Sequence, residues 1–241
     1  MGEKFIFKKI DHSDIVRMRQ IYALRFQVYC YECGFIREED YPEGIEYDKF
    51  DPQSVHFAAI GENGDIVGTM RMILRGDHLF PLEEHCPDVR IDHDALPGVK
   101  YAEISRFVIS KRVRRRRADG MYYEPQFEDQ MGVDEDGEAF LRRCRPMAFG
   151  LYKAMYMESK QLGVTHWYSL MEKSLWLLLK IHGFSFTPCG EEVDFSGPVR
   201  PYIAKVEQVE KDVAKKFPKF FTYFTSAEEA DVPTNKPKFN S

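Results

Sequence analysis

The chain has 241 residues, of which 44% are hydrophobic and 30% are charged, and its net charge is −5 at pH 7. These values are ordinary for a globular protein, so we expect one domain over residues 1–225 and a disordered tail over residues 226–241. The mild acidity argues against general attraction to nucleic acid or to anionic lipid. No apolar run approaches the length of a membrane span and the first residues lack the order of a secretory signal, which together predict a cytoplasmic protein.

Apolar residues at helical spacing predict a first helix over residues 13–33, with Ser13 as its N-cap and Gly34 as its end. Arg25 falls within the apolar seam of this helix, so it either reaches solvent or is held inside by acids. Residues 38–50 are polar and irregular, which predicts a loop.

Of the five cysteines, only Cys30 and Cys33 lie close together in sequence, so no disulfide framework is predicted. Their spacing can be read as half of a zinc site or as a redox pair. No second cysteine or histidine pair with ligand spacing follows, and the pair lies within a helical pattern. We therefore expect two thiols packed on or beside a helix, and no metal site.

A hairpin is predicted from residues 55–60 and 66–74, because the Asn63-Gly64 dipeptide between them tolerates the positive φ of a tight turn. Residues 79–99 contain three prolines and are expected to be connecting structure.

The next strand, residues 101–109, carries charged groups where a strand normally hides apolar ones. Strict alternation would place two sets of side chains on opposite faces, Tyr101, Glu103, Ser105 and Phe107 on one and Ala102, Ile104, Arg106 and Val108 on the other. A buried carboxylate or guanidinium costs several kcal/mol unless it is paired, so Glu103 and Arg106 predict partners elsewhere in the chain.

The second half of the chain alternates helices and strands. We expect an inserted charged loop at residues 113–139, and then a helix with Pro146 in its first turn that Gly163 ends. Further elements are expected in order, a strand at 165–170, a helix at 173–181, a strand near Phe186 and a strand at 199–206 whose Pro201 suggests an edge or a bulge. This order predicts an α/β (α+β) fold that binds ligands where neighbouring strands splay apart.

Three arginines in apolar surroundings and three acids on one loop invite pairing, because bidentate arginine–carboxylate bonds allow such charges to be buried. The alternative is that most of these side chains reach solvent. The residues concerned are Arg25, Arg71, Arg106, Glu46, Asp48 and Asp51.

Four ordered motifs now carry a resemblance: Leu24-Arg25-x-x-x-Tyr29 with Gly34-Phe35, Glu46-x-Asp48-x-x-Asp51, Gly68-x-x-Arg71 and Glu103-x-Ser105-Arg106-Phe107. Over residues 15–186 the sequence resembles the acyl-homoserine-lactone (autoinducer) synthases. It is more similar to the N-acyl amino acid synthases and to the acyltransferases that accompany the PEP-CTERM/exosortase system. The resemblance implies a GNAT-like fold with a central mixed, mostly antiparallel sheet flanked by helices.

The activity implied is transfer of a fatty acyl group from an acyl carrier protein thioester to the amine of an amino acid or related small amino substrate. An autoinducer synthase that acts on S-adenosylmethionine and a non-catalytic acyl- or carrier-binding module are the alternatives. Tyr29 and Phe35 stand where the lactone synthases usually carry Phe and Trp, which counts against S-adenosylmethionine. The Gly-rich pyrophosphate loop of coenzyme A-using relatives is absent after Ile109, which favours acyl-phosphopantetheine on a carrier over acyl-CoA, with no permanently bound cofactor.

The resemblance also implies roles for individual residues. Glu103 accepts the amine proton, or serves only as a structural ion-pair partner, and Ser105 bonds the donor or only the neighbouring strand. Glu46 joins these two as a catalytic candidate. The expected substrate-binding residues are Arg25, Tyr29, Phe35, Asp48, Asp51, Arg71, Arg106 and Phe107.

Six basic residues follow the strand directly, and they either dock the acidic carrier protein or neutralise the acids of residues 124–138. They are Lys111, Arg112, Arg114, Arg115, Arg116 and Arg117. A nucleic-acid binder is not favoured, since this run adjoins an acidic insert. The basic and aromatic residues 211–224 leave peripheral membrane contact open.

Overall fold

The computed structural model describes residues 4–91, 97–113 and 146–226. In these residues an eight-stranded sheet runs in the order β1-β2-β3-β4-β5-β8-β6, and β7 pairs with β8 outside this path. Each pairing is antiparallel except that of β4 with β5, so the predicted mixed, mostly antiparallel sheet is confirmed. The strands are β1 Phe5–Ile10, β2 Ser54–Gly61, β3 Ile66–Leu74, β4 Tyr101–Ile109, β5 His166–Met171, β6 Thr187–Pro188, β7 Val193–Asp194 and β8 Pro198–Lys205.

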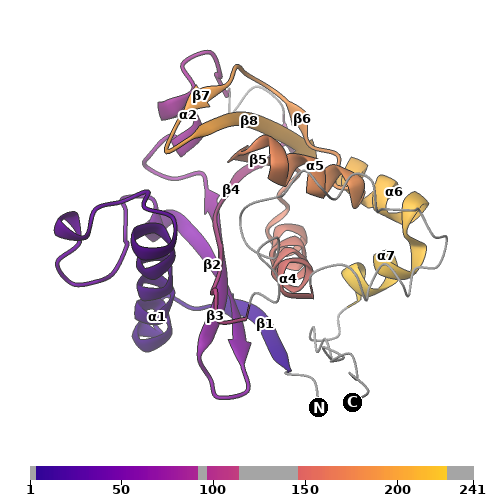
Figure 1. Cartoon of the computed structure of the whole chain (residues 1–241). Helices are drawn as coiled ribbons and strands as arrows, with labels where there is room; N and C mark the ends of the chain where they lie inside the picture. Colours follow the sequence, from indigo (N-terminus) through magenta and orange to yellow (C-terminus); the bar gives the residue numbers. More distant parts are fainter. Residues whose placement is uncertain (1–3, 92–96, 114–145, 227–241) are drawn as a thin grey trace, which may run out of the picture.

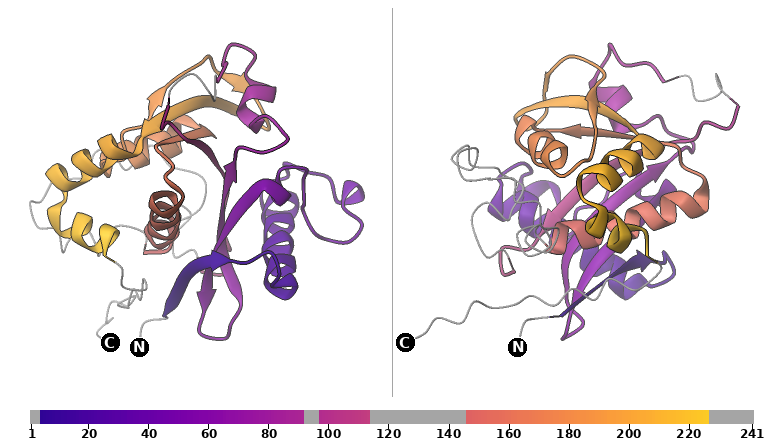
Figure 2. Two further views of the ribbon diagram at one scale, coloured as in Figure 1. Left: turned by 180° about the vertical axis from the view of Figure 1, so that it is seen from behind. Right: turned by 90° about the vertical axis from the view of Figure 1, so that its right-hand side faces the viewer.

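Helices cover both faces of this sheet (Figure 1). Helix α1 (Ile15–Phe26) lies on one face, and α4 (Pro146–Leu162) lies on the other. The remaining helices are α2 Pro81–His85, α5 Lys173–Ile181, α6 Val206–Lys216 and α7 Pro218–Thr225. Figure 2 shows α6 and α7 beside α4, where Val213 and Phe220 join the same apolar core as Phe149.

Each face has its own apolar core because the strand residues alternate. The core under α1 joins Ile21 and Leu24 to Ala58 of β2 and Val108 of β4. The larger core under α4 contains side chains from β2 to β5 and from α4, among them Phe57, Met70, Ile104, Leu151 and Trp167. The sheet is therefore buried on both sides at its centre, and charged groups there require partners.

A β-bulge in β4 changes which face its residues occupy. Thr69 pairs with Val108 and Arg71 with Ser105, so both Arg106 and Phe107 lie opposite Met70. Arg106 adopts a positive φ of 50°, an uncommon backbone conformation for a residue other than glycine. The extra residue inverts the alternation beyond Ser105. The predicted faces are therefore wrong from Arg106 onward: Arg106 points toward the acid loop, Phe107 packs on the α4 side, and Val108 joins the core under α1.

Strands β4 and β5 are paired over only three residues, and the last pair is Glu103 with Tyr168. Beyond that point the Ser169 hydroxyl, rather than a β5 backbone group, donates a hydrogen bond to the carbonyl of Ile104 (3.0 Å). The backbone of β4 thus leaves β5 directly after Glu103, while β5 continues beside β8. This is the divergence of neighbouring strands that the element order predicted.

The first predicted helix is shorter than expected. Asp14, not Ser13, caps it, because the Asp14 side chain accepts the Arg17 N–H (3.1 Å). The α-helix ends at Phe26, and a π-helical segment, Gln27–Glu32, continues the chain. The wider turns of a π-helix shift the side chains within and after it relative to an α-helix. Cys30 lies in this segment and Cys33 lies directly after it. Cys33 packs against the core under α1.

Other predicted boundaries also changed. Strand β1 and helices α6 and α7 were not predicted. Strand β8 lies between β5 and β6, so the edge position suggested by Pro201 is wrong. The predicted insert, residues 113–139, lies outside the described residues except for Val113. The predicted tail, residues 226–241, lies outside them except for Ser226. No described helix has the length and apolarity to cross a membrane.

Candidate active site

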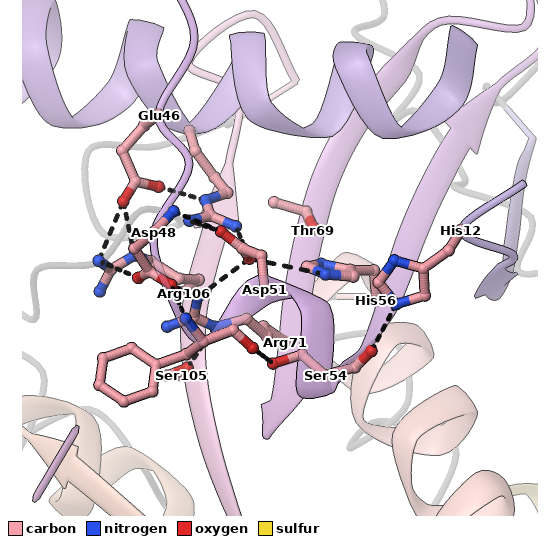
Figure 3. Close-up of polar contacts among 12 residues, drawn as sticks. His12, Glu46, Asp48, Asp51, Ser54, His56, Thr69, Arg71, Ser105 and Arg106 are labelled. Atoms are coloured by element: carbon pink, nitrogen blue, oxygen red, sulfur yellow. Dashed lines mark hydrogen bonds and ion pairs between the residues drawn. The ribbon is translucent and has the colours of Figure 1, made fainter. Parts of the chain in front are cut away.

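The six predicted charges meet on the α1 side of the sheet (Figure 3). Arg25 comes from the last turn of α1. It faces inward and is fully buried. Arg71 comes from β3 and is also buried. Arg106 enters from the β4 bulge and is partly exposed. The loop that carries Glu46, Asp48 and Asp51 crosses above these arginines.

The buried part of this ion-pair lattice centres on Asp51. Its two oxygens accept bonds from Arg25 Nη1 (2.7 Å) and Nη2 (3.2 Å), and Oδ1 also accepts a bond from Arg71 Nη1 (3.0 Å). The Asp48 N–H donates to Asp51 Oδ2 (2.7 Å). Arg25 Nε donates in addition to Glu46, so all three of its nitrogens are bonded. Such bidentate geometry makes burial of these charges possible.

The outer part of the lattice binds Arg106 to the same loop. Arg106 donates from Nε (3.2 Å) and Nη2 (3.0 Å) to Glu46 Oε1, and from Nη2 to Asp48 Oδ2 (3.0 Å). Asp48 Oδ1 accepts from Arg71 Nη1 (2.6 Å). The predicted pairing is therefore found, and the alternative in which these side chains reach solvent does not hold for the inner members.

These contacts set the charge states of the lattice. Burial raises the pKa of Glu46 and of Asp51, but the neighbouring guanidinium groups, led by Arg25 in both cases, lower each pKa by more, below the ordinary value. Burial lowers the pKa of Arg25, but the Glu46 and Asp51 carboxylates raise it by more, so its pKa lies above the ordinary value. Glu46, Asp51 and Arg25 are therefore charged at neutral pH.

Aromatic rings cover the three guanidinium groups. Tyr22 lies 5.3 Å from Arg25, Phe50 5.9 Å from Arg71 and Tyr29 5.5 Å from Arg106, measured from Cζ to the ring centroid. These distances suit cation–π contacts. The Tyr29 ring also neighbours the ring of Phe35, with centroids 6.1 Å apart. Tyr29 and Phe35 thus border the lattice rather than join it.

A buried histidine below the lattice was not predicted. His56 of β2 pairs with Arg71 in the sheet register, and its Nε2 lies 3.6 Å from Asp51 Oδ1. Burial lowers its pKa to about 4, so the ring is neutral at pH 7. His12 meets it edge-on, with ring centroids 5.3 Å apart. The only sequence signal was a polar residue in an otherwise apolar strand.

Glu103 lies on the same face of β4, but its environment differs. It is buried, and its Oε2 accepts a hydrogen bond from the Leu82 N–H of α2 (3.0 Å). Burial raises its pKa to about 8, although Leu82, Arg71 and Arg106 act in the other direction. None of the described arginines forms an ion pair with it. A carboxyl group with this pKa exchanges its proton near neutral pH.

Ser105 stands between Glu103 and the lattice. It is partly exposed, and its Oγ accepts a hydrogen bond from Arg71 Nε (3.0 Å). Phe107, predicted on this face, instead lies 5.9 Å (between ring centroids) from Tyr152 of α4, on the opposite side of the sheet. The bulge is the physical reason, since it turns Phe107 away from the lattice.

Two of the six predicted docking residues, Lys111 and Arg112, are described. They lie in a turn after β4, and exposed Arg112 pairs with Asp65 of the β2–β3 turn (3.0 Å). Residues 114–117 lie outside the described part of the chain. Within the described part, no group of three or more His, Cys, Asp or Glu side chains has an arrangement that could hold a metal ion.

Comparison with known proteins gives the class. Residues 24–124 match the family model "Acetyltransferase (GNAT) domain". The structure is similar to a CoA-dependent acyl-homoserine lactone synthase, BjaI, with 17% identity, a TM-score of 0.59 and coverage of 89% of this chain and 90% of that chain. It is also similar to TofI in a ternary complex with an inhibitor and MTA, with 14% identity, a TM-score of 0.60 and coverage of 89% of this chain and 96% of that chain.

A third similar structure is FeeM, an N-acyl amino acid synthase from uncultured soil microbes, with 13% identity, a TM-score of 0.53 and coverage of 89% of this chain and 97% of that chain. No curated protein sequence matches this chain. Residues 24–124 are therefore similar to the GNAT acetyltransferase domain, and the chain has the fold of these acyl-homoserine lactone and N-acyl amino acid synthase structures. The expected fold and acyltransferase class are confirmed.

Proposed function

We propose that the protein is an N-acyltransferase that moves a fatty acyl group from a thioester to the amine of an amino acid or related amino substrate. The observation that carries this proposal is Glu103, a buried carboxyl group with a pKa of about 8 at the last residue pair of β4 with β5, two residues from the Ser105 that Arg71 of the lattice bonds. A base poised in this range suits the removal of an amine proton.

The chemistry requires few protein groups. The amine nitrogen attacks the thioester carbonyl, a C–N bond forms, the C–S bond breaks and the thiol leaves. Glu103 accepts the proton that the amine loses, and the departing thiolate takes up one proton, from the protonated Glu103 or from water, to leave as the thiol. No covalent enzyme intermediate is needed, so positioning and proton transfer are the contributions expected of the protein.

The donor is proposed to lie along the edge of β4 that β5 vacates. Since the β4–β5 register stops at Glu103, an extended acyl-phosphopantetheine arm can pair with the β4 backbone beyond that residue, as peptides add to open sheet edges. We propose acyl carrier protein as the carrier, guided by the basic residues from Lys111 onward. Acyl-CoA is the alternative, and the similarity to two CoA-dependent acyl-homoserine lactone synthases, BjaI and MesI, supports it.

An autoinducer synthase that acts on S-adenosylmethionine is the second candidate. The observation that favours it is the Arg25–Asp51 lattice, whose motifs occur in the order found in lactone synthases. A carrier-binding module without activity is the third, and a Glu103 poised to exchange a proton argues against it.

Mass spectrometry of lipid extracts from cells that express the protein tests these alternatives. An acyl amino acid that is present with wild-type protein and missing with Glu103→Gln is the expected result. An acyl lactone would support the second candidate. No new acyl amide in cells, together with no thiol release by purified protein from acyl carrier or acyl-CoA, would contradict an acyltransferase.

A further inference from the structure

One buried donor of the lattice, Arg71 Nη2, has no acceptor among the described residues. Arg71 is 1% exposed, and its Nη1 is bonded to Asp48 and Asp51 while its Nε is bonded to Ser105. No described residue accepts a hydrogen bond from its Nη2, although that atom is buried. Arg25 shows the contrast, since the loop acids accept bonds from all three of its nitrogens. A buried charged donor without an acceptor is costly, which indicates that an acceptor arrives from outside the chain.

The position of this donor is fixed by the shape of the guanidinium group. The group is planar, and one Nη2–H points in the same direction as Nε–H. Because Nε–H points at the Ser105 hydroxyl, the free Nη2–H lies along the same edge (Figure 3). Ser105 is partly exposed, and its oxygen accepts the Arg71 bond, so its own O–H is available to a ligand. Two donors, one of them cationic, therefore lie side by side.

A planar anion with two oxygens fits a pair of parallel donors best, and a carboxylate is such an anion. Ser105 is two residues from Glu103 on one face of β4, which places them roughly 6–7 Å apart along the strand. A molecule whose amine faces Glu103 and whose carboxylate faces Ser105 must carry both groups close together. An α-amino acid has this arrangement.

Resting on the proposed acyl transfer, we propose that Arg71 Nη2 and the Ser105 hydroxyl form the carboxylate-binding subsite of the amino substrate. The accepted substrates are then α-amino acids with a free carboxylate, and amines that lack it are poor substrates. Ser105 is a specificity-determining residue in this proposal, rather than one that stabilises the thioester oxyanion.

The test measures kcat/KM for matched substrate pairs. The twenty standard amino acids and S-adenosylmethionine are first screened as acceptors with palmitoyl carrier protein and palmitoyl-CoA. Each accepted acid is then compared with its carboxamide and with its decarboxylated amine. For wild-type protein we expect the acid to be preferred by about 10- to 100-fold, the effect of losing a hydrogen bond to a charged group.

The variant Ser105→Ala should raise KM for the acid and bring the acid and the carboxamide to within a few-fold of each other, with KM for the donor unchanged. The matched control is Thr69→Val, which removes a hydroxyl two residues from Arg71 that donates to the Phe57 carbonyl (3.0 Å), and which should keep the preference. Arg71→Lys should weaken the preference too, and a melting curve will show whether the variant is folded.

Three results would overturn the subsite. Wild-type protein that acylates the acid and its carboxamide equally well has no carboxylate recognition. Ser105→Ala that keeps the full preference removes the role of Ser105. Ser105→Ala that lowers kcat equally for both substrates assigns the hydroxyl to the oxyanion instead. Absence of acylation with every acceptor would contradict the proposed function itself, and is thereby distinguishable from failure of the subsite.

Discussion

The carboxyl groups of Asp51 in the lattice and of Glu103 lie on one face of the same sheet, and both are buried. Their pKa values nevertheless shift in opposite directions. Arginines beside Asp51 lower its pKa, whereas burial raises the pKa of Glu103 to about 8. Burial alone therefore does not decide the charge of an acid; the partners that share the site do. Glu46 and Asp51 therefore stay ionised at neutral pH, whereas the proton of Glu103 can exchange there.

The sharpest test of this difference is Glu103→Gln. It should lower kcat by about 100-fold or more, the usual contribution of a general base, while the protein stays folded. Thiol release from an acyl donor measures the rate, and circular dichroism checks the fold. The exposed Glu84 of α2, near the same strand, gives the control Glu84→Gln, which should retain activity. Unchanged turnover in Glu103→Gln would leave Glu103 without a catalytic role.

The lattice should respond to mutation through stability. Asp51→Asn leaves the buried guanidinium groups of Arg25 and Arg71 without their shared anion, and should lower the free energy of unfolding by about 3–5 kcal/mol. Urea denaturation measures the change. Asp40→Asn, which removes an exposed partner of Arg37, should have little effect. Equal stability of the two variants would show that the lattice does not hold this part of the fold together.

The two sites should also differ in the direction of their pH dependence. Asp51, with its lowered pKa, stabilises the fold above its ordinary pKa of 3.8, and that stability is lost as the pH falls below it. Glu103, with its raised pKa, favours the folded state below its ordinary value of 4.5, and this contribution is lost as the pH rises through about 8.

Glu103→Gln should therefore be more stable than wild type by a few kcal/mol near pH 9, and by much less near pH 5. In wild type, kcat/KM should rise with pH up to about 8 as the free carboxyl ionises. Urea denaturation at the two pH values and a pH–rate profile give both measurements. A variant whose stability gain is the same at pH 5 and pH 9 would place the Glu103 pKa outside this range.

The basic run after β4 gives the smallest expected effect. Charge reversal at Arg115 and Arg116 should raise KM for acyl carrier protein several-fold at low salt, and the difference should shrink as salt screens the attraction. The control is Lys215→Glu at an exposed position of α6, which should leave this KM unchanged. A KM that does not depend on salt would instead favour pairing of these arginines with the acids of residues 124–138.

Much of this architecture was readable from the residues. The hairpin around Asn63-Gly64, the strand that carries Glu103 and the pairing of the arginines with the acid loop were all predicted, because each has a local or compositional cause. His56 and the side of the sheet that Phe107 faces were not. The environment of His56 depends on neighbours from three separate segments. The orientation of Phe107 depends on a β-bulge that no glycine or other turn residue in the sequence indicates.

The order of residue types along the chain thus determined that charges had to be buried and which partners could neutralise them, since a buried charge without a partner is too costly. Only the tertiary structure decided which of those charges stay ionised. A register that stops after three residues leaves Glu103 at the point where two strands part, and one inserted residue turns Arg106 toward the loop. Both follow from backbone geometry, which side-chain periodicity does not encode.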